Sequence, residues 1–244
     1  MRDKIFQIVE DEFSSLVTRI QSDFVTNFKA KQNNFLLKEL DTMMSAHMVF
    51  VSSFESKSGN SIQKVAKEIT KLRYGEENVP QIVNPHNLKH NIQNSNEHEQ
   101  IIVSNIDMNN PELQGRIAEF MTRCEGDKKK KVCCSVNHET ILELLDGDLP
   151  IDTEIHTKPV DLAFWDGDEL NIMEIKAGGN LDSSNAPSNA KKLLTIYTGL
   201  NYRKTKPYFA TIYHKDGEGK TWSGSIKKYL QYPHMFLVGS AFWN

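Results

Sequence analysis

The chain has 244 residues, of which 39% are hydrophobic and 25% are charged, a mixture typical of a globular protein with a real core. Its net charge of −3 argues only weakly against a polyanionic partner, since one basic face suffices to bind one. No stretch approaches the roughly 20 apolar residues that span a bilayer, and the charged N-terminus does not resemble a signal peptide. Three cysteines, two of them adjacent, form no disulfide framework, so we expect a cytoplasmic protein.

The first part of the chain has the pattern of helices. Apolar residues recur at three- and four-residue spacing from Ile5 to Ile20, which predicts one buried helical face. Further helical stretches are expected over about 24–51 and 61–72, with Ser61 as the N-cap of the last. We interpret residues 1–100 as a helical region.

The polar, Asn-rich segment 74–98 is interpreted as a loop, and residues 101–244 are expected to form a second region of the chain. After residue 150 the pattern predicts a strand, a hairpin strand, a helix and two more strands, over 159–165, 170–176, 188–200, 208–214 and 235–243. Asp166-Gly167 is the expected hairpin turn. The predicted fold class is therefore α/β, with a mixed central β-sheet flanked by helices and a helical N-terminal region.

The predicted hairpin carries the residues whose side chains can take part in a reaction. Asp161 lies near the start of its first strand, and Glu174 and Lys176 lie two residues apart on its second. Side chains at i and i+2 share one face of a strand, so Glu174 and Lys176 should project together while Ile175 packs on the other side. The turn should then bring Asp161 alongside them.

Two carboxylates and a lysine in one place suit phosphodiester hydrolysis. Mg²⁺ prefers oxygen ligands and keeps several waters, so Asp161 and Glu174 could bind it together with a substrate phosphate. Lys176 could position or help deprotonate the attacking water and stabilise the developing charge. The alternative reading is an ordinary hairpin with charges at its edge.

The hairpin resembles that of the PD-(D/E)xK nuclease superfamily, whose largest group is the type II restriction endonucleases. Beyond it, EIKAGGNLDSSNAPSNAKKLLTIY and MFLVGSAFWN resemble one subgroup with GGNCC-like targets. The resemblance is clear from about residue 159 onward and vague for the N-terminal half. It implies a restriction-endonuclease-like catalytic core over residues 101–244, with the helix near 61–72 as the first core helix and residues 1–100 serving dimerisation. It also implies a Mg²⁺-dependent enzyme that cleaves double-stranded DNA at a short site.

The resemblance also implies a further acidic residue from an upstream helix. Glu55, Glu139 and Glu143 are the alternatives, and each is equally explained as a helix-surface acid. Glu55 is favoured, because the segment around it resembles the lead into the family's first core helix. Gln63 stands where such helices sometimes carry Glu, so a site with only two acids stays open.

Cleavage of both strands usually needs two active sites, so we expect a homodimer with two-fold symmetry. Residues 191–228 hold nine Lys and Arg residues against Asp216 and Glu218, and either contact phosphates or form a solvated surface. A cognate methyltransferase would act on the same DNA site without binding the chain. The rival functions are a repair or recombination nuclease of this superfamily and a non-catalytic DNA-binding module.

Other motifs are less informative. Cys133, Cys134 and His138 lack the spacing of a zinc site and are interpreted as core or surface residues. The segment Ala177-Gly178-Gly179 lacks a phosphate-loop pattern and is interpreted as letting the backbone approach DNA or as turning the chain. Asn180 and Asp182 fall near the expected site, although turn capping explains both. The four lysines at 128–131 read as a solvated turn.

Overall fold

The computed structural model describes residues 1–35, 37–93, 99–127, 129–130, 132–178 and 185–244. The chain divides into two compact units, Met1–Arg73 and Tyr74–Asn244. In the described part, no helix combines the length and the apolar character needed to cross a membrane.

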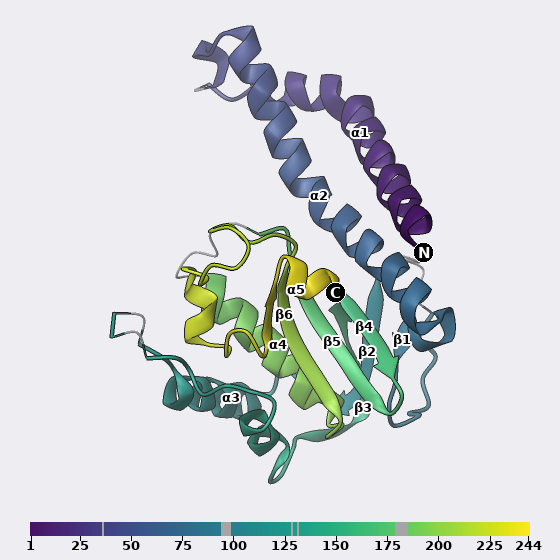
Figure 1. The fold of residues 1–244 in the computed structure, drawn as a ribbon, viewed down its shortest axis with the longest axis vertical. Helices are drawn as coiled ribbons and strands as arrows, with labels where there is room; N and C mark the ends of the chain where they lie inside the picture. Colours follow the sequence, from purple (N-terminus) through teal and green to yellow (C-terminus); the bar gives the residue numbers. More distant parts are fainter. Residues whose placement is uncertain (36, 94–98, 128, 131, 179–184) are drawn as a thin grey trace. The chain divides into compact units, whose positions relative to one another are not determined.

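The N-terminal unit contains two long helices, α1 (Arg2–Gln32) and α2 (Thr42–Tyr74), with the short 3₁₀ helix η1 (Leu37–Glu39) between them. The two helices lie side by side and run antiparallel (Figure 1). Leu16, Ile20 and Val49 are buried in this unit. Across the pair, Arg19 donates a hydrogen bond to Ser61 Oγ over 2.8 Å.

Two of the expected helix boundaries are wrong. The stretch predicted over 24–51 is interrupted after Gln32, and α2 begins afresh at Thr42, where the Asp41 carboxylate accepts a hydrogen bond from the Met44 amide over 2.9 Å. Ser61 is not an N-cap, because α2 runs through it without a break. Its hydroxyl is instead fully buried against α1, where Arg19 satisfies it.

The described residues of the C-terminal unit form seven strands in two sheets. The first sheet has the order β1-β2-β3 and the second the order β4-β5-β6-β7. Their bounds are β1 Ile82–Val83, β2 Gln100–Ile106, β3 Ile151–Val160, β4 Leu162–Asp166, β5 Glu169–Lys176, β6 Thr205–Thr211 and β7 Phe236–Val238. Both sheets are mixed, since β1/β2, β5/β6 and β6/β7 pair in parallel and β2/β3 and β4/β5 antiparallel.

Helices flank these strands (Figure 1). The α-helices of this unit are α3 (Pro111–Cys124), α4 (Asn185–Leu200) and α5 (Ser240–Trp243), and the 3₁₀ helices are η2 (Glu76–Asn78), η3 (Thr140–Leu145) and η4 (Ser225–Lys228). The predicted fold class is confirmed: the chain is α/β, with mixed sheets flanked by helices and a helical N-terminal region. The last predicted strand is shorter than expected, because Gly239, at φ 54, ends β7 and begins α5.

The predicted hairpin is present as β4 and β5, with its turn one residue later than expected. Asp166 pairs with Glu169, so the two loop residues are Gly167 and Asp168 rather than Asp166 and Gly167. Gly167 has φ 62, and a positive φ at the first loop position is what a type II′ turn requires of glycine.

The two sheets are joined next to Asp161. Strand β3 ends at Val160 and β4 begins at Leu162, so Asp161 lies where the chain passes from one sheet to the other. The buried side chain of Gln100, at the start of β2, bonds both backbone groups of Ala163: Nε2 donates to the carbonyl over 2.8 Å, and Oε1 accepts from the amide over 2.9 Å. This amide therefore extends the strand pairing across the junction.

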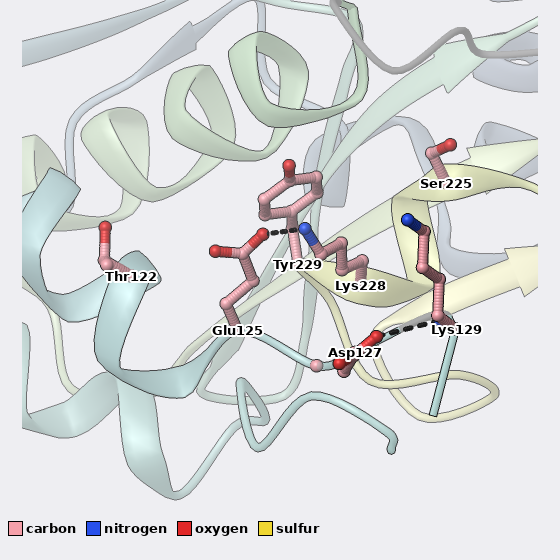
Figure 2. Close-up of a pocket in the computed structure, with 8 residues that line it drawn as sticks. Thr122, Glu125, Asp127, Lys129, Ser225, Lys228 and Tyr229 are labelled. Carbon is pink, nitrogen blue, oxygen red and sulfur yellow. Dashed lines mark hydrogen bonds and ion pairs between the residues drawn. The ribbon is translucent and has the colours of Figure 1, made fainter. Parts of the chain in front are cut away.

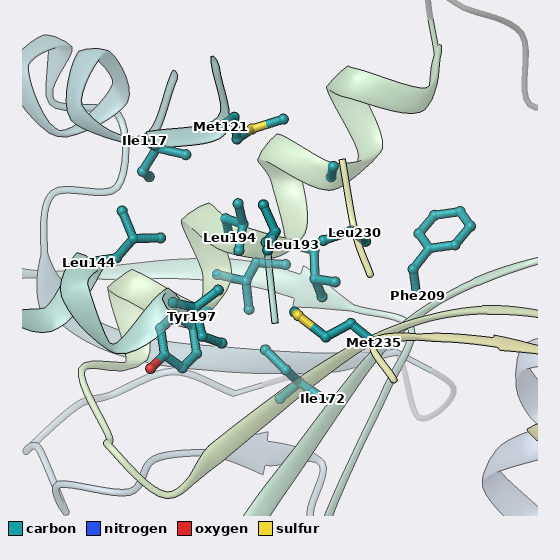
Figure 3. Packing of buried hydrophobic residues seen from close by; sticks show 14 of the residues in the cluster. Ile117, Met121, Leu144, Ile172, Leu193, Leu194, Tyr197, Phe209, Leu230 and Met235 are labelled. Carbon is teal, nitrogen blue, oxygen red and sulfur yellow. The ribbon is translucent and has the colours of Figure 1, made fainter. Parts of the chain in front are cut away.

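The main hydrophobic core lies between α4 and one face of the second sheet. Figure 3 shows Leu193, Leu194 and Tyr197 of α4 packed with Ile172 of β5 and Phe209 of β6. A helix that connects two neighbouring parallel strands covers one face of their sheet, and α4 connects β5 to β6. The β5 side chains on Ile172's face therefore point towards α4.

Candidate active site

The hairpin brings Asp161, Glu174 and Lys176 together, as the sequence predicts. Leu162 pairs with Met173, so the same register sets Asp161 opposite Glu174. The Asp161 carboxylate accepts a hydrogen bond from the Ile175 amide over 2.7 Å, which ties it to β5. Lys176 donates to Glu174 Oε1 over 2.6 Å. The two carboxylates and the amine thus occupy one side of the hairpin.

Glu174 is buried because of its place in the strand. It lies two residues after Ile172 and shares that residue's face, the one that α4 covers. Its side chain is 2% exposed, whereas that of Lys176 is 35% exposed. A buried carboxylate needs partners inside the protein, because its charge is costly to remove from water.

A further lysine, which the sequence pattern did not single out, supplies one of those partners. Lys192 of α4 donates to Glu174 Oε2 over 2.6 Å, so both carboxylate oxygens accept from ammonium groups. In the sequence, Lys192 stands out only as one of the basic residues of the stretch 191–228. The available signal was that a helix after a parallel strand covers the strand face on which alternate residues, Glu174 included, project.

The electrostatics of the pair follow from burial. Burial, and then the negative charge of Glu174, raise the pKa of Asp161 to about 6, against the pull of Lys192, the Ile175 amide and Lys176. Burial opposes the charged form of Lys192, but the charge and hydrogen bond of Glu174 and the charge of Asp161 outweigh it and raise its pKa. The two carboxylates are therefore close enough for the charge of Glu174 to raise the pKa of Asp161.

The donor set fits a hard divalent cation. Asp161 and Glu174 offer only oxygen ligands. Among the described residues no group of three His, Cys, Asp or Glu side chains could hold a metal ion, so these two carboxylates would be the protein ligands. Mg²⁺ commonly binds through one or two carboxylates, completing its shell with water and substrate phosphate. The electrostatic repulsion between the two carboxylates is a cost that a bound cation would relieve.

The three acids considered for a further role have different surroundings. Glu55 is exposed on α2, in the N-terminal unit. Glu139 is exposed at the start of η3, and Glu143 forms an ion pair with Arg123. Gln63, on α2, is half-buried. The role of Glu55 as an additional acid stays a prediction.

The remaining sequence motifs have ordinary environments where the structure describes them. Cys133 is exposed, and burial raises the pKa of the Cys134 thiol to about 11. His138 Nε2 lies 3.1 Å from the Pro207 carbonyl. Gly178 has φ 118, and a side chain there would collide with the ring of Tyr213, which explains glycine after β5. Gly179, Asn180 and Asp182 lie outside the described residues, as do Lys128 and Lys131.

A pocket of about 600 Å³ lies at the end of α3 and is lined by none of the site residues (Figure 2). Lys228 reaches into it from η4 and pairs with Glu125. Lys130, from the predicted solvated turn, lies 3.7 Å from Asp127.

A mixed α/β core whose hairpin presents two carboxylates and a lysine on one face is consistent with the restriction-endonuclease class of nucleases. In agreement, the family model described as type II restriction endonuclease, HinfI, matches residues 1–244. The chain therefore belongs to this family and is a type II site-specific deoxyribonuclease that acts on DNA. No curated protein and no solved structure matches it.

The match extends the relationship to the N-terminal helices, where the sequence resemblance was vague. The family description names no target, so the GGNCC-like site that the resemblance implied stays a prediction.

Proposed function

We propose that the chain is a Mg²⁺-dependent endonuclease that hydrolyses phosphodiester bonds of double-stranded DNA at a specific short site. The observation that carries this proposal is the pairing across the hairpin. Asp161 lies opposite Glu174, and the amine of Lys176 lies 2.6 Å from Glu174 Oε1. Within a restriction endonuclease family, this group of residues is the best supported location for the chemistry.

In this proposal Asp161 and Glu174 are the metal ligands. When bound, Mg²⁺ neutralises charge on the transition state and lowers the pKa of water. The amide of Ile175 holds Asp161 in place, and the burial of Glu174 fixes its orientation. Lys176, which is partly exposed, orients the attacking water and stabilises the negative charge that develops on the phosphate. In the same proposal, Glu55 is an additional catalytic acid.

The proposal extends to assembly and partners. Two copies of the chain, related by two-fold symmetry, would place one site at each DNA strand, and the N-terminal helices are the proposed dimerisation surface. The basic stretch 191–228 would contact phosphates, and a cognate methyltransferase would protect the same target in the cytoplasm. The GGNCC-like target belongs to this proposal as well.

The proposal is tested by cleavage of plasmid DNA with purified protein and Mg²⁺. We expect discrete fragments from the wild type, and a loss of activity of at least about a hundredfold in Asp161→Ala and in Lys176→Ala. Activity should disappear when the metal is chelated and return when Mg²⁺ is restored. Circular dichroism and thermal unfolding verify that both variants are folded.

Full Mg²⁺-dependent cutting by either variant would refute the assignment of the site. Smeared or junction-specific products would instead indicate a repair or recombination nuclease. No cleavage with any of several divalent metals would indicate a DNA-binding module.

A further inference from the structure

Glu174 binds an ammonium group on each of its two oxygens. Lys176 Nζ lies 2.6 Å from Oε1, and Lys192 Nζ lies 2.6 Å from Oε2. Lys176 already has a part in the proposed reaction, whereas Lys192 comes from α4 and has none. With a side chain that is only 2% exposed, Glu174 depends on these two partners to compensate its buried charge.

The position of Lys192 has a direct consequence for a metal ligand. An ammonium group and a divalent cation are attracted to the same lone pairs of a carboxylate oxygen, and they repel each other at that distance. Lys192 also lies close enough to Asp161 for their charges to interact, so it acts on both proposed ligands. Its side chain is 39% exposed, which leaves the ammonium room to move away.

We propose that Lys192 is a positioning residue that competes with the divalent cation for Glu174. It holds Oε2 while the site contains no metal and gives it up when the cation binds. The inference rests on the proposed function, because it takes Asp161 and Glu174 as the metal ligands. In consequence, Lys192 preserves the geometry of the metal-free site and lowers its affinity for the metal.

A purely structural ion pair would behave in the opposite way. If Lys192 only oriented Glu174 for the metal, its removal would leave the ligand misplaced and weaken metal binding. If Lys192 competes with the metal, its removal strengthens metal binding. The sign of the change therefore separates the two roles.

The test is calorimetric titration of Mn²⁺ into the full chain without DNA. We expect Lys192→Met to bind Mn²⁺ about three- to tenfold more tightly than the wild type, because a competing charge has been removed. Lys191→Met is the matched control. It removes the same charge one residue away on α4, from a lysine that has no hydrogen bond or ion pair with a described residue. We expect little change in its Mn²⁺ affinity.

Two further variants make the result decisive. Lys192→Arg keeps the positive charge and should return the Mn²⁺ affinity towards the wild-type value. Glu174→Gln should lose most of the binding, which reports on the ligand itself. Thermal unfolding in a chelator verifies folding, and Lys192→Gln replaces Lys192→Met if the latter is unfolded.

Equal tightening in Lys191→Met and Lys192→Met would overturn the inference, since it would reflect general charge rather than contact with Glu174. Unchanged or weaker binding in folded Lys192→Met, with Glu174→Gln still defective, would overturn it and leave the proposed metal site standing. If wild type and Glu174→Gln bind Mn²⁺ equally, or neither binds it, the proposed metal site fails and the inference fails with it.

Discussion

Asp161 binds its proton more tightly in the folded protein than in the unfolded chain. Its pKa rises from an ordinary value of 3.8 to about 6 through burial and the charge of Glu174. A group with a raised folded-state pKa stabilises the fold below its unfolded pKa, and this contribution is lost as the pH rises through the folded pKa. Between about pH 4 and 6 the metal-free protein therefore loses stability by ionising Asp161.

Asp161→Asn should remove this loss, because an amide oxygen can still accept from the Ile175 amide without bearing charge. We expect the metal-free variant to be more stable than the wild type at pH 8 by about 1–3 kcal/mol, with the difference vanishing near pH 4. Urea unfolding at both pH values, in a chelator, measures it. Asp168→Asn is the control, since Asp168 is exposed and Lys204 lowers its pKa. A less stable Asp161→Asn at pH 8 would contradict the argument.

Three of the four charged residues at the candidate site could be predicted from the sequence. Glu174 and Lys176 share a strand face by their spacing, and a tight hairpin brings Asp161 opposite Glu174. Lys192 could not be separated from Lys191 in this way, because which of two adjacent helical residues reaches the strand depends on how α4 packs on β5. That depends on the core, not on the motif.

Among the secondary-structure elements, Gln100 bridges the junction between the two sheets. It is 1% exposed, bonds both backbone groups of Ala163, two residues after Asp161, and donates to the Pro80 carbonyl over 2.6 Å. We expect Gln100→Ala to reduce the free energy of unfolding by about 2–4 kcal/mol, because it leaves two buried backbone groups of β4 unpaired. DNA cleavage should also fall in the folded fraction, since Asp161 lies at the same junction.

Urea unfolding followed by circular dichroism measures the stability change. The control is Gln114→Ala, which removes another side-chain amide that bonds to the protein, with hydrogen bonds to Met108 O and Thr195 Oγ1, neither of which joins the sheets. If the two variants lose equal stability and retain equal activity, Gln100 has no special role at the junction.

The elements of the second sheet were predictable, because alternation and helical spacing are strong local signals, whereas the strands of the first sheet and α3 were not predicted. The hairpin, α4 and β6 all appear near their expected positions. The long helices were harder. Gly59, just before Ser61, disfavours a helix, yet α2 runs through it. There α1 packs alongside and partners two serines of α2, Ser61 and Ser53. Such support comes from tertiary packing, which local patterns do not contain.

In the proposed homodimer, the helices of the N-terminal unit form the interface between the two copies, and this can be tested. Apolar side chains at three- and four-residue spacing on α2 are exposed, including Met48 at 41%, Val51 at 51% and Phe54 at 40%. An apolar stripe of this kind on a helix is typical of an interaction surface. We expect the double variant Val51→Glu, Phe54→Glu to dissociate into monomers at micromolar concentration.

Sedimentation equilibrium measures the assembly state. Val132→Glu, at a valine of the C-terminal unit that is 56% exposed, is the control and should leave the dimer intact. A wild type that is monomeric at all concentrations would refute the homodimer itself. A double variant that stays dimeric would place the interface elsewhere on the chain.

The double ion pair on Glu174 also affects the net charge of the site and thus its attraction for a polyanion. Above about pH 6 the two carboxylates and the two ammonium groups at the site, Asp161, Glu174, Lys176 and Lys192, carry formal charges that cancel. A divalent ion would turn this neutral group into one with an excess of two positive charges, beside which a phosphodiester is favoured. An empty site would therefore offer little attraction to the DNA backbone, and a loaded one would draw a phosphate to the residues that act on it.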